Sequence, residues 1–127
     1  MENKEQLQEL HSENLEWLKN LVFYADEIKN MQSRIEEIAR ENTSRSVMPK
    51  IDHFENQLQI QKNEYNHLKH AIKNNEKLIN EAMSNTGGSA TQIFASDHSN
   101  VREKVIIFEK IINDLRLELD QFLQLAM

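Results

Sequence analysis

The chain has 127 residues, a formal net charge of -6 and no cysteine. This length suits one domain with a sizeable core and is short for two, so we expect a single domain over residues 1–127. The absence of cysteine excludes disulfides and thiol chemistry, and the excess of acids argues against nucleic acid, whose binders concentrate Lys and Arg on one face.

The first predicted helix covers about residues 4–42. From Leu7 to Ile38 its apolar residues recur at alternating spacings of three and four, which is the pattern of a helix that buries one stripe. Asn14 interrupts this stripe with an amide. A helix striped in this way needs other helices to cover it.

A second helix is predicted over about 47–84, after a polar turn at 42–46. Pro49 is tolerated in its first turn, where a missing N–H costs nothing. In an antiparallel helix pair, facing residues have position numbers that add to a constant. The two stripes match throughout when that constant is 89, which places Asn14 opposite Asn75. We predict that these two amides bond each other and pin the register.

A glycine-bearing segment, 85–97, is predicted to be a flexible link before a third helix over about 99–126. Its stripe matches the second helix when the constant is 180, with Tyr65 opposite Leu115, although the link leaves room for a shift of one heptad. In that register the hairpin tip near Val47 has only two-helix cover. The prediction is an all-α, up-down-up antiparallel three-helix bundle with coiled-coil-like packing.

The three long helices, with Trp17 in the first, resemble a spectrin-type repeat. The resemblance concerns architecture and heptads. It implies a structural or protein-binding role and no chemistry.

One motif is suited to a metal. Glu64 and His67 have the Glu-x-x-His spacing of carboxylate-bridged di-iron bundles, and His70 follows. Those sites need two such motifs and two further inward carboxylates, whereas this chain has one motif. We therefore expect no metal and no cofactor, and keep as the alternative a metal-binding bundle whose site a second chain completes. His98 is expected in the link or in a first helical turn, exposed or capping.

Nothing in the sequence assembles a nucleophile with a base, and the Gly87–Gly88 tract lacks the Lys and Ser/Thr of a nucleotide-binding loop. We therefore expect no enzyme and no small-molecule substrate. The polar first residues are unlike a signal peptide, and no apolar run has the length of a membrane span. A cytoplasmic protein without a membrane partner is predicted.

Several apolar residues fall outside the three stripes: Leu15, Val22, Phe23, Ile106 and Leu117. In the register described above, Leu15 is level with Ile106, and Phe23 lies near Leu117, which allows a patch on the first and third helices. Such patches mark interaction sites. We therefore expect a structural or protein–protein interaction module whose partner is a second copy of itself or another helical protein.

Overall fold

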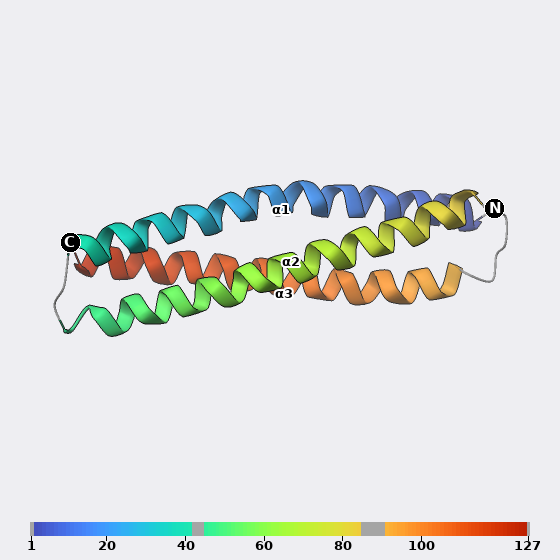
Figure 1. Ribbon diagram of the computed structural model, residues 1–127. Helices are drawn as coiled ribbons and strands as arrows, with labels where there is room; N and C mark the ends of the chain where they lie inside the picture. The colour runs from blue at the N-terminus through green and yellow to red at the C-terminus, as the bar shows by residue number, and fades with distance from the viewer. Residues whose placement is uncertain (1, 42–44, 85–90, 127) are drawn as a thin grey trace.

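The computed structural model describes residues 2–41, 45–84 and 91–126. They form three helices, α1 (Glu2–Glu41), α2 (Met48–Ser84) and α3 (Thr91–Ala126), which run up, down and up along one elongated bundle (Figure 1). At 1.5 Å per residue each helix is about 54–60 Å long. No strand occurs in these ranges, so the predicted all-α antiparallel three-helix bundle is confirmed.

α2 begins at Met48, and two backbone hydrogen bonds to Val47 form its first turn. The carbonyl oxygen of Val47 accepts hydrogen bonds from the backbone N–H groups of Lys50 (3.0 Å) and Ile51 (3.1 Å). Pro49 lies in this first turn, where its missing N–H leaves no acceptor unpaired. The start lies one residue after the predicted one. Part of the predicted turn, residues 42–44, lies outside the described residues.

The core follows the predicted stripes of α1 and α2. Every apolar stripe residue of α1 between Leu7 and Ile38 is buried. Nδ2 of Asn14 donates a hydrogen bond to Oδ1 of Asn75 at 3.1 Å, as expected when facing positions add to 89. The match between the two apolar stripes therefore predicted the register of α1 and α2 correctly.

The third helix differs from the prediction in its start and its register. It begins at Thr91 instead of 99, so residues 91–97 of the predicted link are helical. The ring of Tyr65 lies 6.4 Å from that of Phe108, and the side chain of Asn75 bonds His98. Both pairs add to 173, seven less than the predicted 180. The register with Leu115 opposite Tyr65 is therefore wrong by one heptad.

Polar side chains explain the shift. The predicted register would have placed the buried amide of Asn75 against Val105, which offers no hydrogen bond, at a cost of about 1–3 kcal/mol. In the observed register the amide meets His98. The apolar stripes of α2 and α3 match in both registers, so the match between stripes alone did not choose between them.

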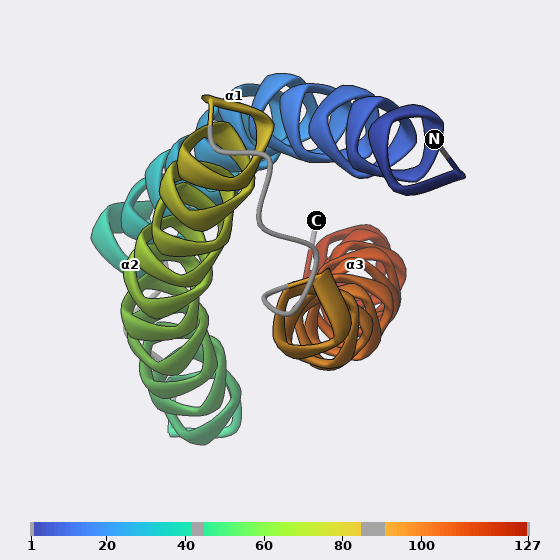
Figure 2. The same ribbon diagram turned by 90° about the vertical axis from the view of Figure 1, so that its right-hand side faces the viewer.

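The shift also covers the hairpin tip. Ile51 and Leu123 are buried, and Val47 packs against the same core. The predicted two-helix cover at the tip is therefore wrong, because α3 reaches it. Viewed along the bundle, the helices are inclined to one another and α3 lies in the angle between α1 and α2 (Figure 2). One long side of α3 consequently faces away from both neighbours.

Candidate functional site

A polar layer built from all three helices interrupts the core. Asn14, Asn75 and His98 are each 0% exposed. Nδ2 of Asn75 donates to Oδ2 of Asp97 at 2.7 Å, which fixes the orientation of the amide. Its Oδ1 accepts from Asn14 and faces Nδ1 of His98 at 2.8 Å. The layer therefore holds α3 to α2 through directional bonds.

His98 has an oxygen acceptor at each ring nitrogen. Nε2 lies 2.6 Å from Oε1 of Glu13, and Nδ1 faces Asn75. The two ring nitrogens thus connect His98 to α1 through Glu13 and to α2 through Asn75. The ring also stacks on Trp17, with centroids 4.7 Å apart. The predicted exposed or capping role of His98 is wrong, because the residue is helical and buried.

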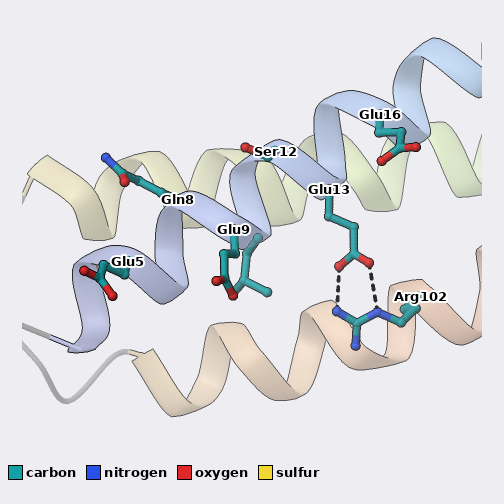
Figure 3. Close-up of a pocket in the computed structure, with 8 residues that line it drawn as sticks. Glu5, Gln8, Glu9, Ser12, Glu13, Glu16 and Arg102 are labelled. Atoms are coloured by element: carbon teal, nitrogen blue, oxygen red, sulfur yellow. Dashed lines mark hydrogen bonds and ion pairs between the residues drawn. The ribbon is translucent and has the colours of Figure 1, made fainter.

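Glu13 also binds Arg102 of α3. Nη2 of Arg102 donates to Oε1 at 2.5 Å and Nε donates to Oε2 at 3.2 Å, a bidentate pair that Figure 3 shows. The Arg102 hydrogen bond lowers the pKa of the Glu13 carboxyl below its ordinary value of 4.5; His98 also lowers it, and burial opposes the shift. The same bond raises the pKa of Arg102. Glu13 thus joins α1 to α3 at two points.

On the other side of Asn14 the network continues to α2. Nδ2 of Asn14 donates a second bond to Oε1 of Glu76 at 3.2 Å, and Nδ1 of His11 pairs with Oε2 of the same carboxylate. We call the whole set the polar cluster: His11, Glu13, Asn14, Asn75, Glu76, Asp97, His98 and Arg102.

The side chains of the polar cluster pair mainly with one another. Its basic side chains face its carboxylates and its amides bridge them, while Oδ1 of Asn14 accepts no hydrogen bond from the described residues. Asn14 and Asn75 lie in one layer as predicted, and their function as a register pin stays a prediction. Sequence reasoning missed Glu13 and Arg102, which flank the apolar stripes, and did not place His98 in the core, although His98 continues the α3 stripe three residues before Val101.

An open pocket lies between α1 and α3 beside the polar cluster (Figure 3). Its lining residues are Glu5, Gln8, Glu9, Leu10, Ser12, Glu13, Glu16 and Arg102. Four of these side chains are carboxylates, and the one cation, Arg102, is bound by Glu13. The pocket therefore presents no unpaired cation that would hold an anionic substrate.

The metal candidates Glu64, His67 and His70 are all exposed on α2. Within the described residues, no group of three or more His, Cys, Asp or Glu side chains is arranged to hold a metal ion. Among the residues that the structure describes, none is brought to these three as a further ligand.

The predicted interaction residues Leu15, Val22, Phe23, Ile106 and Leu117 are 51–63% exposed. The heights predicted for these residues along the bundle depended on the α3 register that is wrong by one heptad. The Tyr24 hydroxyl donates to Glu109 at 2.8 Å and its ring contacts Phe108, which makes Phe23, rather than Leu15, level with the Ile106–Ile107 pair.

The three of these residues that belong to α1 lie on two different sides of that helix. Val22 lies eleven residues, or three turns, after His11, whose side chain contacts α2. Phe23 lies one turn before Glu27, which pairs with Arg116 of α3. Leu15, four residues after His11, shares the side of Val22. Phe23 and Ile106 therefore border the α1–α3 groove, while Leu15 and Val22 lie toward α2.

α3 carries most of the exposed aliphatic surface. Besides Ile106 and Leu117, the structure exposes Ile107, Ile111 and Leu125 on this helix. Sequence reasoning passed over these three because each lies beside a predicted stripe. Their concentration on one helix makes α3 the main candidate interaction surface.

A scan against protein-family models, a search of curated proteins and a search of solved structures each found no match to this chain. In the three described helices, no apolar stretch is long enough to cross a membrane.

Proposed function

We propose that this chain is a non-enzymatic protein–protein interaction module that forms a coiled-coil-like homodimer. The observation that carries the proposal is the outward side of α3, where Ile106, Ile107 and Leu117 are each more than half exposed. The buried stripe of α3 is complete without them. Contact with water is unfavourable for such side chains, so covering them favours association.

The outward rows of the other two helices support α3 as the associating element. α1 exposes Leu15, Val22 and Phe23, which divide between two sides of that helix, and α2 exposes Met48 and Ile60, which lie twelve residues apart. Isolated exposed apolar residues of this kind are ordinary on a protein surface. A cluster of several aliphatic residues on one helix is less ordinary.

The polar cluster supports a role without catalysis, because its ionisable groups bond one another across the helices. We also propose a cytoplasmic location, which the cysteine-free sequence supports.

Sedimentation equilibrium of the full chain across the micromolar range tests self-association. We expect a mass that rises from monomer toward dimer with concentration. The Ile106→Asn, Leu117→Asn double variant should stay closer to monomer, while Leu15→Asn, which changes an exposed residue on another helix, should behave as the wild type. A monomer at every concentration would remove self-association from the proposal.

A further inference from the structure

A second regular stripe runs along the outer side of α3. Its members recur at alternating spacings of three and four, and all are exposed. We call it the outer stripe: Asn100, Glu103, Ile107, Lys110, Asp114, Leu117, Gln121 and Gln124. Every helix face recurs at this spacing, so what marks this one is its middle, where the apolar Ile107 and Leu117 enclose the opposite charges of Lys110 and Asp114.

We propose that two copies of this chain pair antiparallel through the outer stripe, about a two-fold axis perpendicular to α3. The inference rests on the proposed function and names its surface. When facing positions add to 224, Ile107 meets Leu117 of the second copy. In the same register Lys110 meets Asp114 of the second copy. Two-fold symmetry makes each pair occur twice.

Neighbouring registers are less complementary. A shift of one heptad in one direction places Glu103 against Asp114, and a shift in the other places Asp114 against Leu117. A parallel pairing in register places Lys110 against its own copy. Like charges or a charge on an aliphatic group disfavour these arrangements. Among these arrangements, the register at 224 joins apolar to apolar and positive to negative.

The flanks of the stripe fit the same register. On one flank Lys104 faces Glu118 of the second copy, and Ile111, which is 37% exposed, meets its own copy near the axis. On the other flank Asp120 faces Ile106 of the second copy in this register, and Arg34 of its own chain binds the carboxylate at 2.7 Å. Its charge is therefore balanced before the copies meet. An interface centred on a few aliphatic residues is small, and we expect micromolar dissociation.

Charge reversal tests the register. Lys110→Asp alone or Asp114→Lys alone places like charges in both symmetric pairs, and each should weaken homodimerisation about tenfold. An equimolar mixture of the two single variants should instead form a heterodimer, because each residue 110 then faces an opposite charge at 114. Circular dichroism verifies that both variants remain helical, and sedimentation with one labelled variant measures the heterodimer.

Cysteine cross-linking tests the geometry independently, since the chain has no cysteine of its own. Ile111→Cys should yield a covalent dimer with a short bismaleimide, because this residue meets its copy near the axis. Val22→Cys is the matched control, since it is an exposed aliphatic position on α1. It should give little cross-linked dimer at the same concentration.

The two proposals fail in different ways. A wild-type dimer that neither charge variant weakens, and that cross-links no better at 111 than at 22, would overturn the outer stripe and leave self-association standing. A wild type that is monomeric throughout the micromolar range would overturn both. Heterodimer formation by the mixed charge variants would support the antiparallel register.

Discussion

The three helices meet through hydrogen-bonded polar side chains at one end of the bundle and through apolar side chains at the other. Near the α2–α3 connection the three helices meet through Asn14, Asn75 and His98. Toward the α1–α2 hairpin the equivalent layer contains Ile35, Phe54 and Leu119, all at most 1% exposed. Hydrophobic burial is non-directional, whereas hydrogen bonds require particular partners. We therefore expect the apolar end to contribute more to stability and the polar end to disfavour other registers.

Sliding α3 by one heptad shows the difference. At the hairpin end the slide would withdraw α3 by one heptad, so Ile51 and Val47 would lose the cover that α3 gives them. At the polar end it would remove His98 and Asp97 from Asn75. A buried polar residue that specifies register at some cost in stability is a recognised feature of coiled coils.

The largest expected loss of stability comes from the apolar end. Phe54→Ala removes a side chain that is 1% exposed and whose ring lies 5.4 Å from that of Phe122. We expect the free energy of unfolding to fall by about 3–5 kcal/mol, measured by urea denaturation. Phe23→Ala, at an exposed phenylalanine, should change it by less than about 0.5 kcal/mol. Equal losses for the two variants would contradict the assignment of Phe54 to the core.

A smaller loss is expected at the polar end. His98→Ala leaves the buried Oδ1 of Asn75 with one donor fewer and exposes a face of Trp17. We expect a loss of about 1–3 kcal/mol. His53→Ala is the matched control, because that exposed ring contacts Glu118 at the surface and should cost under about 1 kcal/mol. A His98→Ala variant as stable as the control would show that the polar layer contributes little.

Much of the fold could be predicted because apolar periodicity sets helix faces and lengths. α1 and α2 match in one register, since a short turn joins them. The third helix was placed a heptad away because the longer connection permits both registers and the apolar stripes match in both. Asp97 lies in the segment predicted as a flexible link, although it is helical and accepts a hydrogen bond from Asn75. Asn14 and Asn75 could be named in advance, whereas their contacts to α3 required the correct register.

A modest gain in stability is expected from replacing the one amide in an otherwise apolar layer at the middle of the core. Gln61 is 4% exposed, and its buried Oε1 accepts no hydrogen bond from the described residues. Gln61 lies level with Ile28 of α1 and Ile112 of α3, which are both buried. Gln61→Leu should raise the free energy of unfolding by about 1 kcal/mol. The exposed change Gln59→Leu should leave it nearly unchanged. A loss on Gln61→Leu would show that the amide is satisfied in solution.

The smallest expected effect is the change in stability as the pH falls. Because the Arg102 hydrogen bond lowers the pKa of Glu13 below 4.5, the ionised carboxylate stabilises the fold fully above the pKa of the unfolded chain. That contribution is lost as the pH falls through the lower, folded pKa. We therefore expect the stability gap between wild type and Glu13→Gln to be widest near neutral pH and to close at acidic pH. Glu36→Gln, at an exposed carboxylate of α1, should show a smaller gap at neutral pH. Thermal unfolding from neutral to acidic pH measures both. A Glu13 gap that persists after the carboxyl is protonated would mean that shape, rather than its charge toward Arg102 and His98, holds α1 to α3.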